Sequence, residues 1–168
     1  MTVRPRPLSL YTHTRDHSNL SGARTMTSND KPHAQAERLA EALQALARGV
    51  PNPWDESTDY FHQFTAAMPA TQRLDAESFR RAADVGERYT IDLSPADDAL
   101  ARLTDSATGT SDDIAGGFRQ LAAVMRATLT DLSLAFARGK GVVRVRVWLF
   151  GRTADGTLVG LRSISTET

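Results

Sequence analysis

Apolar and other residues alternate strictly near the end of the chain, over residues 143–150. The first series is Val143, Val145, Val147 and Leu149, and it alternates with Arg144, Arg146, Trp148 and Phe150. A repeat of two residues is the period of a β-strand. Asp155-Gly156 then supplies a turn, and a second strand-like run leads to Glu167-Thr168. The pattern predicts a β-hairpin over residues 141–168 that ties the end of the sequence into a sheet.

A helical period governs two long segments. The first is expected to be a helix because its apolar residues share one face. These residues are Leu39, Leu43, Leu46 and Val50. This helix should begin at Asp30, and Gly49 together with Pro51 should stop it. The second and longest helix is expected over residues 112–138 and to end at Gly139. Its apolar stripe is made of Ile114, Phe118, Leu121, Met125, Leu129, Leu132 and Phe136.

Shorter elements lie between these two helices. Strands are expected at residues 61–68 and 89–93, and a helix capped by Asp75 is expected to close at Gly86. Ser94-Pro95-Ala96-Asp97 resembles a capping box with proline at the first helical position, so a further short helix should start there. With only about four strands, the predicted fold is α+β: a three-layer α/β/α sandwich with a mostly antiparallel sheet and a C-terminal β-hairpin.

Composition divides the chain into two parts. Residues 1–29 are rich in Thr, Ser, Arg, Pro and His without an apolar period, and we interpret them as a disordered N-terminal tail. Residues 30–168 form the expected domain. The tail carries a formal charge of +3 and the remainder −3. A mildly acidic domain argues against non-specific electrostatic binding to the phosphates of nucleic acid, so no direct nucleic-acid contact is expected.

Other compositional features bear on disulfide chemistry and on the cellular location of the protein. The chain has no cysteine, which excludes a disulfide framework and thiolate chemistry. No run of about 18 apolar residues suggests a membrane span, and the N-terminus lacks the apolar core of a signal peptide. The expected location is therefore cytoplasmic, without a membrane partner.

Catalytic motifs are missing from the sequence. We find no zinc-protease helix motif, no phosphate-binding loop and no nucleophile elbow. His62 is the one histidine well inside the domain, and it is expected to point outward from a short strand. Asp97-Asp98 and Asp112-Asp113 are explained by helix N-termini, where a carboxylate gains roughly 0.3–1 kcal/mol. We therefore expect no enzyme, no cofactor and no metal site of the protein's own.

Arginine and aromatic residues share one side of the strand at 143–150, and two interpretations stay open. Arg144 and Arg146 with Trp148 and Phe150 could bind single-stranded nucleic acid through phosphate contacts and stacking. The favoured alternative is the solvent-facing half of a strand whose outer end a helix covers. Arg152 and Arg162 add charge without making a dense basic patch.

Two other features could serve a partner. Asp55-Glu56-Ser57 is an acidic loop that follows Pro51-Asn52-Pro53-Trp54, and two prolines reduce the entropy that a loop loses on binding. Glu167-Thr168 ends the sequence beside the predicted strand. Each also has a plain structural interpretation: the loop as an ordinary surface turn, and the terminal pair as simple sheet termination.

These features together resemble the nuclease A inhibitor family. From Val143 to Thr168 the chain is similar to that family without a gap, through the alternating strand that ends at Gly151 and the closing Glu167-Thr168. Thr153, Gly156, Leu158 and Gly160 also match. Residues 55–64 are similar as well, through Glu56-Ser57, Phe61 and Phe64. The similarity covers roughly residues 32–168.

The resemblance implies a function. Members of this family are small α/β/α sandwiches that block sugar-non-specific endonucleases of the ββα-metal type. An inhibitor glutamate and the C-terminal threonine reach the hydrated metal ion of the nuclease, where a substrate phosphate would sit. Matched by position, these roles fall on Glu56 and Thr168, flanked by Asp55, Ser57 and Glu167. The alternative is a nucleic-acid-binding or general protein-interaction module without inhibitory activity.

The chain also departs from the family. Where the matching strand of the family carries acidic residues, this sequence has Arg144 and Arg146, with Arg152 after the strand. The loop before the longest helix is shorter, and residues 105–111 lack the family's aromatic residue. We therefore expect that the core fold is kept and that the target differs from the family's or is lost.

Overall fold

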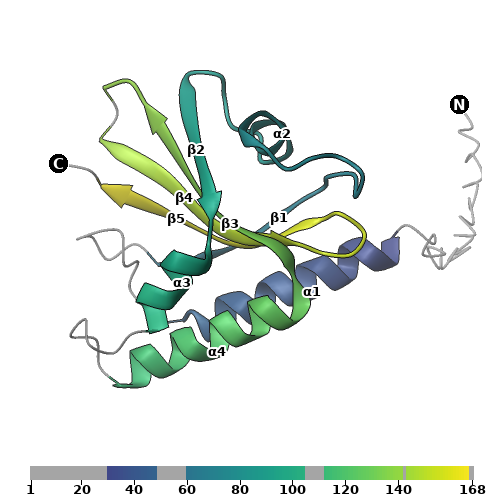
Figure 1. The fold of residues 1–168 in the computed structure, drawn as a ribbon, viewed down its shortest axis with the longest axis vertical. Coiled ribbons are helices and arrows are strands. Elements are labelled where there is room, and N and C mark those ends of the chain that lie inside the picture. The colour runs from purple at the N-terminus through teal and green to yellow at the C-terminus, as the bar shows by residue number, and fades with distance from the viewer. Residues whose placement is uncertain (1–29, 49–59, 105–111, 142, 167–168) are drawn as a thin grey trace, which may run out of the picture.

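The computed structural model describes residues 30–48, 60–104, 112–141 and 143–166. They form an α+β fold in which the helices and the sheet strands are intermixed along the chain (Figure 1). The elements are α1 (Asp30–Leu46), β1 (His62–Ala66), α2 (Ala76–Ala82), β2 (Tyr89–Pro95), α3 (Asp97–Thr104), α4 (Asp112–Thr128), β3 (Thr130–Gly139), β4 (Arg144–Arg152) and β5 (Leu158–Thr166).

The sheet has five strands within the described residues, where the sequence predicted about four. Their order is β1-β5-β4-β3-β2, and every neighbouring pair is antiparallel. The predicted C-terminal hairpin is confirmed as β4 and β5, which pair from Arg144↔Thr166 to Arg152↔Leu158. The strands predicted near residues 61–68 and 89–93 are confirmed as the two edge strands β1 and β2.

The additional strand comes from the second half of the predicted longest helix. That helix stops at Thr128, and residues 130–139 form β3 in the interior of the sheet. Leu132 and Phe136 are four residues apart and continue the helical stripe, but Leu132, Leu134 and Phe136 also alternate with Ser133 and Ala135 as in a strand. Pairing with both β2 and β4 decides between the two periods, so the prediction of a helix over 112–138 was wrong.

Two predicted helix boundaries also need correction. Asp75 caps α2 as predicted, through a reciprocal capping box with Ser78, but the helix ends at Ala82 rather than at Gly86. Pro95 is not the first helical residue of α3. It is the last residue of β2, opposite Ser133, and α3 begins at Asp97.

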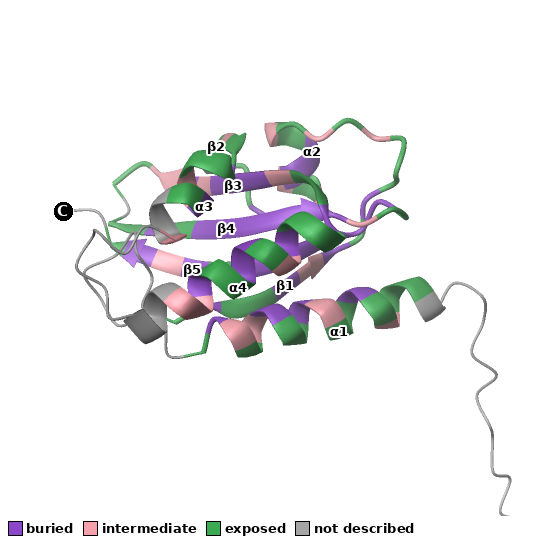
Figure 2. Cartoon of the chain, turned by 60° about the horizontal axis from the view of Figure 1, so that its bottom comes forward, coloured by how far each residue is buried: buried purple, intermediate pink, exposed green. Residues whose placement is uncertain are grey.

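The helices cover the two faces of the sheet unequally. α1, α3 and α4 pack on one face, where they share a core with Val145, Val147 and Leu149 of β4 (Figure 2). α2 packs on the other face, where Phe79 meets Trp148 and Phe150. Successive residues of β4 therefore belong to opposite cores, as the alternation of side chains along a strand requires.

Candidate functional site

The five residues predicted to contact a partner lie outside the described residues. These are Asp55, Glu56 and Ser57 in one segment and Glu167 and Thr168 in the other. The structure does describe the residues that are close to both segments in sequence. Tyr60 lies just before β1, and Thr166 is the last residue of β5.

These two points belong to neighbouring strands. β1 pairs with β5 in antiparallel fashion, from His62↔Arg162 to Ala66↔Leu158. Beyond the first pair, the Ser163 hydroxyl donates a hydrogen bond to the Tyr60 carbonyl over 3.3 Å. Because the strands run in opposite directions, the start of β1 and the end of β5 lie at the same end of the sheet.

The basic and aromatic residues of β4 are separated by the fold. Trp148 and Phe150 are only 4% and 0% exposed, because α2 covers them. The Phe79 ring stacks on Phe150 with ring centres 4.8 Å apart and meets Trp148 edge-on at 5.4 Å. Arg144 and Arg146, farther along the same face, are exposed. The two aromatic rings are thus part of a core and are closed to the bases of a nucleic acid.

Tyr89 connects the exposed arginines to this core. The guanidinium carbons of Arg88 and Arg146 lie 5.1 Å and 5.2 Å from the centre of the Tyr89 ring. Arg88 also donates a hydrogen bond from Nη2 to the Tyr89 hydroxyl over 3.2 Å. The cation–π contact orients both guanidinium groups, and Arg88 also uses one N–H donor on the ring hydroxyl. His62, on β1, is exposed, as the sequence predicted.

Arg152 has a different environment from the other arginines. It is 8% exposed, and its guanidinium donates to the Ala70 carbonyl over 3.1 Å and to the Gln72 carbonyl over 2.8 Å. Its Nε lies 3.8 Å from an Asp131 carboxylate oxygen. The sequence suggested that Arg152 could belong to a basic surface. Its contacts instead tie residues 70–72 to the end of β4.

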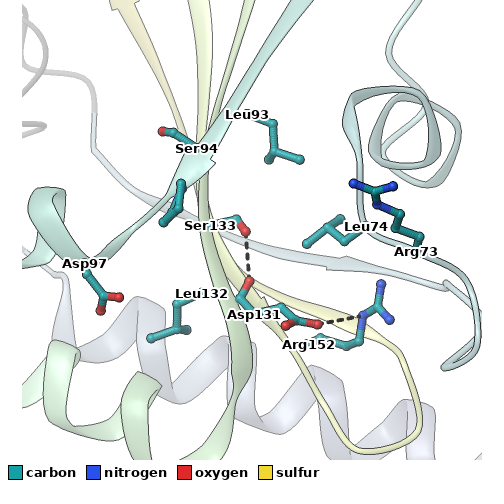
Figure 3. A pocket seen from close by; sticks show the side chains of 10 residues that line it. Arg73, Leu74, Leu93, Ser94, Asp97, Asp131, Leu132, Ser133 and Arg152 are labelled. Atoms are coloured by element: carbon teal, nitrogen blue, oxygen red, sulfur yellow. Dashed lines mark hydrogen bonds and ion pairs between the residues drawn. The ribbon is translucent and has the colours of Figure 1, made fainter.

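A hollow of about 730 Å³ lies beside Arg152 (Figure 3). It is lined by Arg73, Leu74, Leu93, Ser94, Pro95, Asp97, Asp131, Leu132, Ser133 and Arg152. Two arginines and two aspartates leave its lining without net charge. The Ser133 hydroxyl donates to the backbone carbonyl of Asp131 over 2.8 Å, so it is engaged by the turn. Asp131, Ser133 and Arg152, which line the hollow, are therefore already used in contacts that hold the fold together.

The two carboxyl groups with a clear pKa shift belong to the N-cap of α2 and to the β4–β5 turn. Ser78 holds the pKa of Asp75 below its usual value, first through its backbone N–H and then through its hydroxyl. Hydrogen bonds from the Thr153 and Thr157 hydroxyls lower the pKa of Asp155. Within the part of the chain that the structure describes, no three His, Cys, Asp or Glu residues gather as metal ligands would.

A comparison with known protein families finds no match to this chain, and a comparison with curated proteins finds none either. Among the helices in the described residues, none is long and apolar enough to cross a membrane.

Proposed function

We propose that this protein inhibits a sugar-non-specific, metal-dependent endonuclease of the ββα-metal type. Glu56 and Thr168 engage the hydrated metal ion in the nuclease active site, and Asp55, Ser57 and Glu167 complete the contact. The similarity of residues 55–64 and 143–168 to the nuclease A inhibitor family supports this assignment. Helices on both faces of the sheet agree with the α/β/α sandwich that the similarity implies for residues 30–168.

The antiparallel pairing of β1 with β5 is the observation that carries the proposal. Glu56 precedes Tyr60 by four residues, and Thr168 follows Thr166 by two. In this ladder, each step back along β1 is matched by one step forward along β5. The pairs end at His62↔Arg162, so the described residues nearest in sequence to Glu56 and Thr168 lie at one end of the sheet. This register supports joint action of a loop carboxylate and a terminal hydroxyl on one point of a partner.

The chemistry of a nuclease centre fits this pair of groups. A hard divalent cation prefers oxygen ligands and keeps several of its waters. A carboxylate that accepts hydrogen bonds from those waters imitates a phosphate oxygen, and a bond with an ionised partner is stronger than a neutral one. The rest of the affinity would come from a protein interface of roughly 1,200–2,000 Å² in total.

Removal of the last two residues tests the proposal. We expect the chain that ends at Thr166 to keep its circular dichroism spectrum and to lose inhibition of DNA cleavage by a purified ββα-metal endonuclease with magnesium. We expect Glu56→Ala to weaken binding by about 1–3 kcal/mol in titration calorimetry, the scale of a hydrogen bond to a charged group. Glu41→Ala, at an exposed position of α1, is the matched control and should bind normally. Full inhibition by the truncated chain would refute the role of the terminus.

A further inference from the structure

One half of the α2 side of the sheet is left uncovered by the described elements. α2 and residues 68–72 cover the half nearer the β4–β5 turn, where Phe79 and Met68 share a core with Phe150 and Leu158. Toward the β3–β4 turn, exposed and basic side chains of β4 and β5 lie on this face beside the buried Tyr89 and Ala137. We call Arg88, Arg144, Arg146 and Arg162 the open sheet patch; all four are exposed.

The strand geometry groups these arginines on one face. Arg144 and Arg146 are two residues apart on β4, so they point the same way and repeat at about 7 Å. Arg162 of β5 is paired with Trp148, which makes it the diagonal neighbour of Arg146 on that same face. Arg88 immediately precedes β2 and reaches this group through Tyr89.

The patch is partly ordered before any ligand binds. Tyr89 is 8% exposed and is part of the α2-side core, so its ring is a fixed base for both Arg88 and Arg146. A guanidinium fixed in this way loses less side-chain entropy when it binds an anion. Its planar set of donors matches phosphate oxygens with two parallel hydrogen bonds.

The charge of the patch is not neutralised by carboxylates of the described residues. None of its four arginines forms an ion pair there, whereas Arg138, on the opposite face of the sheet, pairs with Asp92 at 3.3 Å. Glu87 is an exposed carboxylate next to Arg88 in sequence and leaves the group with a net charge of +3. The domain is therefore acidic as a whole and strongly basic on this part of one face.

We propose that the open sheet patch binds the sugar-phosphate backbone of single-stranded nucleic acid, without reading its sequence. Arginines at strand spacing can engage successive phosphates of an extended chain. Tyr89, Trp148 and Phe150 on this face are buried, so these rings offer no surface for base stacking and the phosphates carry the affinity. A flat sheet face also has no projecting element to enter the groove of a duplex.

Salt dependence gives this proposal a measurable signature. Binding of the full chain to a fluorescent single-stranded oligonucleotide can be followed by anisotropy from about 20 to about 200 mM salt. Three to four phosphate contacts predict a slope of log affinity against log salt of about −2 to −3, at roughly −0.7 for each contact. Arg162→Gln should reduce the steepness by about 0.7.

A double variant that reverses two charges tests whether the oligonucleotide binds at the open sheet patch. Arg144→Glu with Arg146→Glu should weaken binding at least about tenfold. Arg38→Glu with Arg119→Glu makes the same change of charge at exposed positions of α1 and α4, and it should bind almost as the parent does. Arg144→Gln with Arg146→Gln replaces the first pair if the glutamate version does not fold.

Three outcomes would overturn the proposal. These are an absence of binding at the lowest salt, equal losses in the two charge-reversed pairs, and tighter binding of a labelled polyglutamate peptide than of the oligonucleotide. The last result would assign the patch to an acidic protein surface. The assay contains no nuclease, so its failure leaves the inhibitor proposal standing. Loss of nuclease inhibition would likewise leave the oligonucleotide result unchanged.

Discussion

At residue 152, a charged side chain is used to hold the fold together. Both terminal nitrogens of Arg152 donate to backbone carbonyls, at Ala70 and Gln72, in a stretch outside the helices and strands. Asp131, whose backbone has a positive φ of 50°, supplies a nearby negative charge. Arg152 therefore stabilises the contact between residues 70–72 and the end of β4.

Replacement of Arg152 by leucine should destabilise the protein. We expect a loss of about 3 kcal/mol in the free energy of unfolding, because hydrogen bonds to charged groups contribute about 1.5–3 kcal/mol each and two carbonyls lose their donor. Urea denaturation measures this loss. Arg162→Leu, on the neighbouring strand and exposed, should change stability by less than about 0.5 kcal/mol. Similar losses in the two variants would contradict the role assigned to Arg152.

At the scale of elements, the β4–β5 turn is closed by a small hydrogen-bond network. The Thr153 N–H donates to the Thr157 carbonyl and the Gly156 N–H donates to the Thr153 carbonyl, both over 2.9 Å. The Asp155 carboxylate accepts from the hydroxyls of Thr153 and Thr157. Gly156 has a φ of +98°, and an added Cβ would lie 2.4 Å from the Met68 carbonyl oxygen. The turn is therefore fixed by its own side chains and by the neighbouring segment.

The lowered pKa of Asp155 predicts a pH-dependent contribution from this turn. A carboxyl group whose pKa is lower in the folded state stabilises the protein above its unfolded pKa, near 3.8, and this stability is lost as the pH falls through the folded pKa. We expect Asp155→Ala to lower the thermal midpoint at neutral pH and to converge with the parent protein in strong acid. Thr153→Val removes the hydrogen bond that contributes most to the lowered pKa of Asp155. In that background, Asp155→Ala should lower the thermal midpoint by less. Parallel pH profiles for Asp155→Ala and the parent would contradict this prediction.

Most elements could be predicted from the sequence because their periods are unambiguous. The hairpin alternates over a long run, and the apolar residues of α1 fit one helix face. The segment after Thr128 could not be assigned in this way, since Leu132 and Phe136 continue the helical stripe while Leu132, Leu134 and Phe136 also alternate as in a strand. Its strand conformation depends on pairing with β2 and β4, which are distant in sequence. A local pattern carries no information about such partners.

At the scale of the whole molecule, the two parts of the functional hypothesis have different origins. Glu56 and Thr168 come from sequence similarity, and the structure adds the shared end of β1 and β5. The open sheet patch could not be predicted from net charge, because a sum over the chain hides which face each charge occupies. The sheet register resolves this, since it separates Arg144 and Arg146 from Arg138 on the opposite face.

The sheet also couples the two cores, which predicts a single unfolding transition. Leu149 and Phe150 are consecutive and fully buried in opposite cores, so β4 cannot keep one core packed after losing the other. We expect Leu121→Ala on the α4 side to cost about 2–5 kcal/mol, and Phe79→Ala on the α2 side about 3–5 kcal/mol.

Two probes of unfolding test this coupling in each variant. Far-ultraviolet circular dichroism follows all elements, and the fluorescence of Trp148 follows the α2-side core in a Trp54→Phe background. The midpoints from both probes should coincide in each variant, because loss of either core removes the support of the same five strands. If fluorescence changed before circular dichroism in Phe79→Ala alone, α2 would be a separate unfolding unit, and the sheet would need only the α1 and α4 side to stay folded.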